Sequence, residues 1–337
     1  MRRLIPVSLL CGLLTACGDP APPLPVITPS VPQQTLDELV GVAAGPYPVS
    51  EQQFTLEPET GRDVPLRIFY SECAPSCPLV VFSHGFGSGN SEYDRVLRHW
   101  ASHGMVVVAA NHADSGGLLY GILASLRYGQ LGLMEVRIAD LKLVLDQLAA
   151  IAVRIDRPLD PQRIIAAGHS FGAFTAQQLI GAGAFNPETE RMEYVEDPRI
   201  LAAVALSPPG PMFDQITDQS WKQVRKPMLI TTGTRDAEPR FWPDWRIHKL
   251  SFETSLPGSK YALVVEGADH YLGNLICRTD TEAEPQTHAL MMVNAVSTAF
   301  ISAQFAAVEA GRSDGGLILS ADYLHDLTKG FATVELR

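Results

Sequence analysis

Short apolar runs alternate with stretches of helical periodicity along most of the chain. The runs are rich in β-branched residues, which favours buried strands, and they cover Gln52 to Leu56, Val64 to Tyr70, Leu79 to Ser83, Met105 to Ala110, Ile164 to Ala167, Ala202 to Leu206, Met228 to Thr232 and Tyr261 to Val265. Helical spacing of apolar positions appears at Ser91 to His103, Met134 to Ile155 and Gln286 to Ala310. This repetition of strand and helix predicts an α/β fold, with a mostly parallel eight-stranded sheet covered by helices on both faces.

The first predicted helix carries terminal signals of its own. Ser91 and Asp94 have the spacing of a capping box, and Gly104 follows the last periodic position. We therefore expect this helix to begin at Ser91 with a side-chain cap.

The N-terminal residues have the layout of an export signal. Two arginines precede an apolar run of about a dozen residues, which is too short to span a bilayer stably, and small residues follow it. The end of the run, "LTAC", resembles a bacterial lipoprotein signal, which implies cleavage before Cys17 and lipidation of that cysteine. Because Gly18, and not an aspartate, follows Cys17, the resemblance favours the outer membrane, facing the periplasm. Ordinary cleavage with release of the product is the alternative.

Composition divides the rest of the chain. Residues 1–16 form the signal, and 17–47 are rich in proline, which predicts a stiff tether between the lipid and the folded body. We expect the folded domain over residues 48–312 and assign no role to the extension 313–337. The net charge of −11 excludes nucleic acid as a partner, because such a surface repels phosphate.

Three cysteines lie beyond the signal region. Cys73 and Cys77, in "SECAPSCP", could close a small disulfide loop in an oxidising periplasm, or could remain as two thiols. Cys277 stands alone in the sequence. No zinc-binding spacing of cysteine or histidine is present, so we predict no metal.

The stretch "IIAAGHSFGAFTAQQL" places a serine between a predicted strand and a predicted helix. Gly168 and Gly172 flank Ser170 at two residues on either side, where a sharp elbow leaves no room for a β-carbon. The elbow exposes the serine hydroxyl at the N-terminus of a helix, whose partial positive charge favours a developing oxyanion. Ser170 is therefore the candidate nucleophile.

The partners that a nucleophilic serine needs occur later and earlier in the chain. Asp236 follows the strand in "PMLITTGTRDAEPR", and His270 follows the next strand in "YALVVEGADHYLGN". The order serine, aspartate, histidine is typical of an α/β-hydrolase. The turn in "VFSHGFGSG" can direct backbone N–H groups at a carbonyl oxygen, so we predict Phe86 and Phe171 as the two oxyanion-hole donors.

Simpler interpretations exist for each of these residues. Asp236 could be an acid that forms a turn, with Asp214 as the reserve acid, and His270 could be a surface histidine. His84 is expected to be structural. Asp269 is a poor candidate for orienting His270, because adjacent side chains at a strand end diverge.

The quoted motifs, together with "ASHGMVVVAANHADSG", resemble bacterial α/β-hydrolases related to platelet-activating-factor acetylhydrolase and to dienelactone hydrolase. The resemblance covers about Val49 to Ala310 and implies the α/β-hydrolase fold. Two positions depart from that family. Plasma-type acetylhydrolases place the acid where this chain has Ser207, and true dienelactone hydrolases use a cysteine where it has Ser170.

The predicted activity is hydrolysis of short-chain or lipid-like carboxylic esters through an acyl-enzyme, with no cofactor. Gly85, Trp242 and Tyr271 are candidate substrate-binding residues. The apolar segment Ser115 to Leu133 could wall an acyl pocket or could belong to the core. Alternative functions are a thioesterase or peptidase on the same fold, or a lipid-anchored binding protein without turnover.

Overall fold

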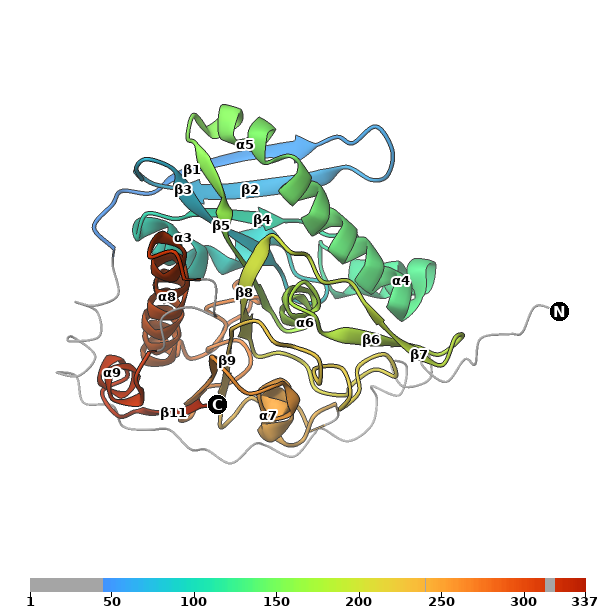
Figure 1. Ribbon diagram of the computed structural model, residues 1–337. Helices are drawn as coiled ribbons and strands as arrows, with labels where there is room; N and C mark the ends of the chain where they lie inside the picture. Colours follow the sequence, from blue (N-terminus) through green and yellow to red (C-terminus); the bar gives the residue numbers. More distant parts are fainter. Residues whose placement is uncertain (1–44, 240, 313–318) are drawn as a thin grey trace.

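A computed structural model describes residues 45–239, 241–312 and 319–337, and a twisted nine-stranded sheet runs through it (Figure 1). In sheet order the strands are β1 (Ser50–Leu56), β2 (Val64–Tyr70), β4 (Val106–Ala110), β3 (Cys77–Ser83), β5 (Leu159–His169), β8 (Ile200–Leu206), β9 (Met228–Gly233), β10 (Lys260–Val265) and β11 (Ala332–Leu336). The strands from β4 to β10 are parallel to one another, whereas β1, β2 and β11 pair antiparallel.

All eight predicted strands are present, and the mostly parallel sheet is confirmed. The ninth strand, β11, comes from the C-terminal extension and pairs with the edge strand β10. The sequence did not predict it, because a single short alternating segment after a long helix carries little signal for an edge strand. The extension also forms α9 (Ala321–Leu327).

Helices cover both faces of the sheet (Figure 1). One face carries α4 (Leu118–Asp146), α5 (Leu148–Ile155) and α6 (Phe171–Gln178). The other carries α3 (Asp94–Ser102) and α8 (Thr287–Glu309), with α9 beside them. The remaining elements are the hairpin β6 (Gly183–Asn186) and β7 (Arg191–Tyr194), the 3₁₀ turns η1 (Asn90–Tyr93) and η2 (Trp245–Lys249), and α7 (Leu250–Thr254).

The central strands are buried on both sides. Along β3, Leu79 and Val81 belong to the core under α4 and α6, while Val80 and Phe82 belong to the core under α3 and α8. Burying an aliphatic or aromatic side chain of this size contributes roughly 1.5–3 kcal/mol. Helices on both faces therefore explain why these strands are continuous apolar runs in the sequence.

The long helix α8 is apolar and long enough to cross a membrane, but most of it is buried against the sheet. Its Ser297 hydroxyl accepts a hydrogen bond of 2.9 Å from the indole N–H of Trp100 on α3. This burial and this contact identify α8 as a core helix.

Two helix predictions require correction. Ser91 lies inside the 3₁₀ turn η1, and neither η1 nor α3 has a side-chain cap, so the predicted capping box is wrong. The helix expected from Met134 begins at Leu118 and is interrupted at Gly129, where φ is 71°. Apolar residues all around the first part of α4 hid its periodicity.

Cys73 and Cys77 form a disulfide with a Cα–Cα distance of 5.3 Å, which closes the turn before β3. Cys277 is a free cysteine. The predicted signal and lipidation site, Cys17, lie outside the described residues, as does most of the predicted tether.

Candidate active site

Ser170 occupies the single position between β5 and α6. Its backbone has φ 53° and ψ −122°, an unfavourable conformation for a residue with a side chain, and its N–H donates to the Leu206 carbonyl on β8 at 2.9 Å. A β-carbon on Gly168 would lie 2.2 Å from the Gly172 oxygen, and one on Gly172 would lie 2.1 Å from the Ser83 oxygen. The two glycines thus let β5, β3 and α6 meet closely enough to present the partly exposed Ser170 at the turn.

Asp236 follows β9 and is fully buried. Its Oδ2 accepts a hydrogen bond of 2.9 Å from the Thr232 hydroxyl, and its Oδ1 lies 2.7 Å from Nδ1 of His270. Burial by itself raises the pKa of Asp236, but the charges and hydrogen bonds of His248 and His270 hold that pKa well below its usual value. The carboxylate is therefore ionised and can orient an imidazole.

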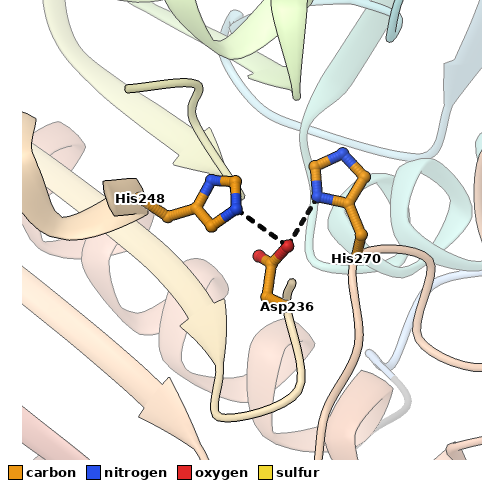
Figure 2. A group of neighbouring side chains, drawn as sticks. All are labelled: Asp236, His248 and His270. Atoms are coloured by element: carbon orange, nitrogen blue, oxygen red, sulfur yellow. Dashed lines mark hydrogen bonds and ion pairs between the residues drawn. The ribbon is translucent and has the colours of Figure 1, made fainter. Parts of the chain in front are cut away.

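His270 lies in the loop after β10 and is almost completely buried. Because an ionised carboxylate only accepts, Nδ1 of His270 carries the proton that faces Asp236, which leaves Nε2 able to take a proton (Figure 2). The ring centroid of His270 lies 4.8 Å from that of His169, which directly precedes Ser170 in the chain. The fold thus brings the loop that carries His270 alongside the elbow that carries Ser170.

A chain of hydrogen bonds joins the loops of the site through His169. The Gly85 N–H donates to the Tyr93 hydroxyl at 2.9 Å, and this hydroxyl lies 3.0 Å from Nδ1 of His169. Nε2 of His169 donates to the His270 carbonyl at 2.9 Å. Burial lowers the pKa of His169 to about 3, so its ring is neutral and can accept from Tyr93 while donating to His270.

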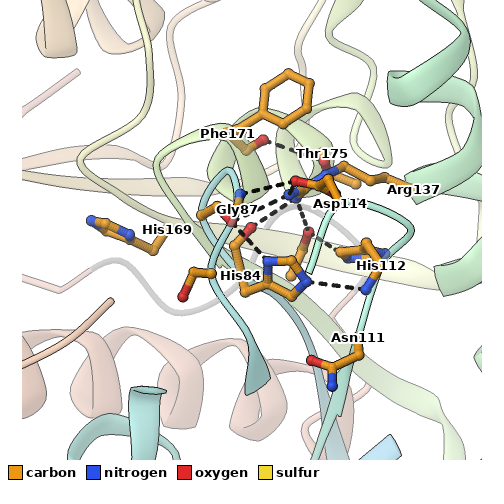
Figure 3. Close-up of polar contacts among 12 residues, drawn as sticks. His84, Gly87, Asn111, His112, Asp114, Arg137, His169, Phe171 and Thr175 are labelled. Carbon is orange, nitrogen blue, oxygen red and sulfur yellow. Dashed lines mark hydrogen bonds and ion pairs between the residues drawn. The ribbon is translucent and has the colours of Figure 1, made fainter. Parts of the chain in front are cut away.

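The predicted oxyanion loop rests on a buried ion pair. Arg137, on α4, donates to the His84 carbonyl at 2.7 Å and to the Gly85 carbonyl at 3.3 Å (Figure 3). Its guanidinium also forms two hydrogen bonds with Asp114, of 3.0 Å and 2.6 Å, and Asp114 accepts from the Gly87 N–H at 3.1 Å. Both charged side chains are fully buried, and Arg137 lowers the pKa of Asp114 against the opposing effect of burial.

Arg137 also touches the second predicted oxyanion residue. Its guanidinium carbon lies 4.7 Å from the ring centroid of Phe171, and the ring of Phe171 meets that of Phe86 edge to face at 6.2 Å. One buried cation therefore contacts both segments that carry the predicted donors.

Two buried histidines, His84 and His112, form further hydrogen bonds within and beside this loop. Nδ1 of His84 donates to the Gly85 carbonyl at 2.7 Å, and Nε2 of His84 accepts from the His112 N–H at 3.0 Å. The His112 ring lies 2.8 Å from the Ser83 hydroxyl and 2.9 Å from Asp140. Burial lowers the pKa of both imidazoles, that of His84 well below its usual value. His84 has the structural position expected of it.

The predicted substrate-binding residues have different surroundings. Gly85 is a buried residue of the predicted oxyanion loop, with its N–H and its carbonyl both hydrogen-bonded inside the protein. The ring of Trp242 lies 5.2 Å from that of His270, and Tyr271 meets His270 edge to face at 4.9 Å. Of these three predicted residues, Trp242 and Tyr271 therefore lie directly beside His270.

The other acids considered from the sequence serve elsewhere or face solvent. Asp269 accepts from the N–H groups of Tyr271 and Gly273 and from the Gln286 side chain, so it shapes the loop that carries His270. Asp214 is exposed. Asp236 is the acid whose carboxylate contacts His270.

The apolar segment after β4 is divided between surface and core: Ala124 and Leu133 are buried in the core, whereas the large side chains at the start of α4 are exposed. Five large apolar side chains on the first turns of α4 are between 53% and 66% exposed, and they are Leu118, Leu119, Tyr120, Leu123 and Leu126. We call this set the α4 apolar face. The same helix contacts the predicted oxyanion loop, because a β-carbon on Gly121 would lie 2.8 Å from the Phe86 ring.

Within the described residues, Asp236, His248 and His270 could also be considered as metal ligands, since they offer three ligand atoms within 4.8 Å of one another. Each imidazole, however, directs a ring nitrogen at the same oxygen, Oδ1 of Asp236, at 2.7 Å or 3.0 Å. Nδ1 of His270 forms a hydrogen bond with this oxygen and Nε2 of His248 forms an ion-pair contact with it, an arrangement that suits pairing with a carboxylate better than shared coordination of an ion.

Five residues that contact the site were not predicted from the sequence, and they are Tyr93, Asp114, Arg137, His169 and His248. The signal available for His169 was its place inside the G-x-S-x-G motif. Asp114 lies within the quoted stretch "ASHGMVVVAANHADSG", and no motif marks Tyr93, Arg137 or His248.

The strand order, the elbow after β5 and the acid and histidine after β9 and β10 define the α/β-hydrolase fold, and this chain adopts it. A family model described as Chlorophyllase matches residues 42–120. A ferulic acid esterase from Streptomyces cinnamoneus superposes with a TM-score of 0.58 at 18% identity, over 87% of this chain and 98% of that one. A puromycin hydrolase superposes with a TM-score of 0.55 at 17% identity, over 80% of this chain and 41% of that one. No curated protein matches the sequence.

Proposed function

We propose that this protein is a serine hydrolase that cleaves carboxylic esters through an acyl-enzyme. The observation that carries the proposal is the strained Ser170 elbow beside a histidine whose Nδ1 is held at 2.7 Å by a buried carboxylate. The esterase and hydrolase names of the two structural neighbours agree with this chemistry.

The proposed reaction begins when the Ser170 hydroxyl attacks the ester carbonyl carbon while Nε2 of His270 takes its proton. The Asp236 carboxylate stabilises the imidazolium that forms. The alcohol leaves with the proton from His270, and water activated by the same histidine then hydrolyses the acyl group from Ser170.

The proposed oxyanion donors are the N–H groups of Phe86 and Phe171. The neighbouring Gly85 and Gly87 N–H groups are bound to Tyr93 and Asp114, which leaves the N–H of Phe86 as the donor that this loop offers to a substrate. Phe171 begins α6, where backbone N–H groups have no acceptor within the helix.

For the substrate we propose an uncharged, lipid-like ester. The α4 apolar face exposes five large side chains beside the loop of Phe86. The segment from Ser115 to Met134 contains no acid and a single base, Arg127, in a chain of net charge −11. An apolar surface without acids suits acyl chains better than sugars or phosphate esters.

The cell-envelope location remains part of the proposal. A lipid on Cys17 and the proline-rich tether would hold the hydrolase near a membrane, where esters of this kind gather. Metabolic labelling with a fatty-acid analogue, compared between wild type and Cys17→Ala, tests it, and equal labelling of the two would contradict it.

The decisive test of the activity uses nitrophenyl esters of rising chain length. Ser170→Ala should lower kcat by on the order of three or more decades, whereas the exposed Ser91→Ala should not. A fluorophosphonate probe should label wild type and not Ser170→Ala. If Ser170→Ala kept its esterase activity and were still labelled by the probe, the proposal would be contradicted.

A further inference from the structure

The carboxylate of Asp236 faces two imidazoles. His248, in η2, places its Nε2 at 3.0 Å from Oδ1 of Asp236, and His270 approaches the same oxygen at 2.7 Å. Figure 2 shows the two rings on opposite sides of the carboxylate. A serine nucleophile requires only one of these imidazoles, so the second needs an explanation.

The contacts of His248 determine its charge. Its Nδ1 lies 2.7 Å from the Pro208 carbonyl oxygen, which can only accept a hydrogen bond, so this nitrogen carries a proton. Its Nε2 lies close to the ionised carboxylate of Asp236. The two form an ion-pair contact and not an aligned hydrogen bond. A carboxylate also attracts an N–H and repels a lone pair. Both ring nitrogens are therefore protonated, and His248 is a cation.

The electrostatics of the surroundings agree with this assignment. His248 is almost completely buried, which by itself lowers its pKa, but Asp236 and the Pro208 carbonyl raise that pKa above its usual value. The other titratable rings that face it are His270, with a centroid distance of 5.5 Å, and the neutral His169. The Trp242 ring meets that of His248 edge to face, with a centroid distance of 6.0 Å.

We propose that His248 is a positioning residue that acts through Asp236. As a cation it fixes the carboxylate between two imidazoles and offsets part of its negative charge. The charge of His248 thereby weakens the attraction between Asp236 and the imidazolium that forms on His270 during the reaction. This inference rests on the proposed function, because it assigns His270 as the base.

The direct test measures kcat/KM against pH with a soluble nitrophenyl ester for wild type and His248→Gln. Removing a positive charge this close to His270 should move the acidic limb to higher pH by on the order of one unit. At pH about 8, where the base is free in both proteins, kcat should fall less than tenfold. The matched control is His99→Gln, another buried histidine, on α3, whose pKa is lowered to about 4 by burial and which is therefore neutral.

An acidic limb that does not move in an active His248→Gln would overturn the inference and leave the proposed function standing. A limb that moves equally in His99→Gln would also overturn it. Absence of Ser170-dependent turnover in wild type would instead overturn the proposed function, and the positioning role of His248 with it.

A second measurement does not require His248→Gln to fold. In wild-type protein labelled with ¹⁵N-histidine, the His248 signals, assigned by proximity to Trp242, should show both ring nitrogens protonated from pH 6 to 8. A neutral His248 ring at pH 7 would refute the proposed cation whether or not the protein is an esterase.

Discussion

Arg137 donates a hydrogen bond of 2.7 Å to the main-chain carbonyl of His84, across 53 residues of sequence. The guanidinium thereby holds the carbonyl groups of His84 and Gly85 on one side of the loop. The N–H of Phe86, the next residue, can then face a substrate. Asp114 keeps the guanidinium charge paired inside the protein. A buried ion pair of this kind orients the loop at some cost in desolvation.

Replacing Arg137 should therefore impair the transition state more than substrate binding. Arg137→Lys keeps the charge but loses the planar fork that binds Asp114 and two carbonyls together. We expect kcat to fall by on the order of ten- to a hundredfold, with KM changed much less. Arg127→Lys, on the exposed side of the same helix, is the control. Equal losses for both variants would contradict the role of Arg137.

The identity of the triad acid can be tested against its reserve. Asp236→Asn should lower kcat by about three to four decades, because the amide favours the wrong tautomer of His270. The exposed Asp214→Asn should leave kcat unchanged. The two variants are compared with the same ester at pH 8, and the opposite result would move the acid to Asp214.

The α4 apolar face should matter only for substrates at an interface. The triple substitution Leu118→Ser, Leu119→Ser and Leu123→Ser should reduce hydrolysis of long-chain esters in vesicles or micelles by on the order of tenfold or more, since each exposed Leu contributes about 1.5–3 kcal/mol on burial. Hydrolysis of a soluble short-chain ester should be unaffected. Val153→Ser is the control, because this valine is 83% exposed on α5. Equal losses on both substrates would indicate damage to the loop of Phe86 instead.

Stability should depend on pH through the buried carboxylates. The pKa values of Asp236 and Asp114 are lower in the folded protein than their ordinary values. Their contribution to the free energy of unfolding is thus fully present above about pH 4 and is lost as pH falls further, because the unfolded chain then binds protons that the folded chain does not. The urea midpoint should decline steeply below about pH 4.

Asp114→Asn provides the matched comparison. It should lower the free energy of unfolding at pH 7 by about 3–5 kcal/mol, because it leaves the Arg137 charge buried without its partner. It should also show a shallower decline of the urea midpoint on acidification. A decline as steep as that of wild type would show that other groups dominate acid unfolding.

Chelation tests whether the three-residue cluster around Asp236 serves a metal. If the two imidazoles pair with the carboxylate and hold no ion, dialysis against EDTA should leave esterase activity unchanged, and added zinc should inhibit by competing for the same nitrogens. Loss of activity in EDTA that zinc restores would favour a metal centre at Asp236, His248 and His270.

The parts of the fold that the sequence predicted are those with local physical causes. Strands such as β3 are continuous apolar runs because both faces of the sheet are covered, and Gly168 and Gly172 are required by close backbone contacts. Ser170, Asp236 and His270 each follow a predicted strand, so they could be named as candidates from the sequence. The structure places Oδ1 of Asp236 at 2.7 Å from Nδ1 of His270.

The remainder depends on tertiary contacts that leave no local pattern. Arg137 appeared as one polar residue in a helix, and His248 as one histidine among aromatic and basic residues. The exposed half of α4 was interpreted as pocket or core because apolar residues usually lie inside. Local patterns show which side chains are polar, but not which distant carbonyl or carboxylate each will meet.

The chain of contacts through Tyr93 and His169 has a consequence for engineering. Since it couples the glycine turn, the serine elbow and the histidine loop, grafting any one of these segments from another hydrolase would detach the other two from their common support. A successful exchange of segments should therefore have to move all three together with Tyr93, whose hydroxyl connects them.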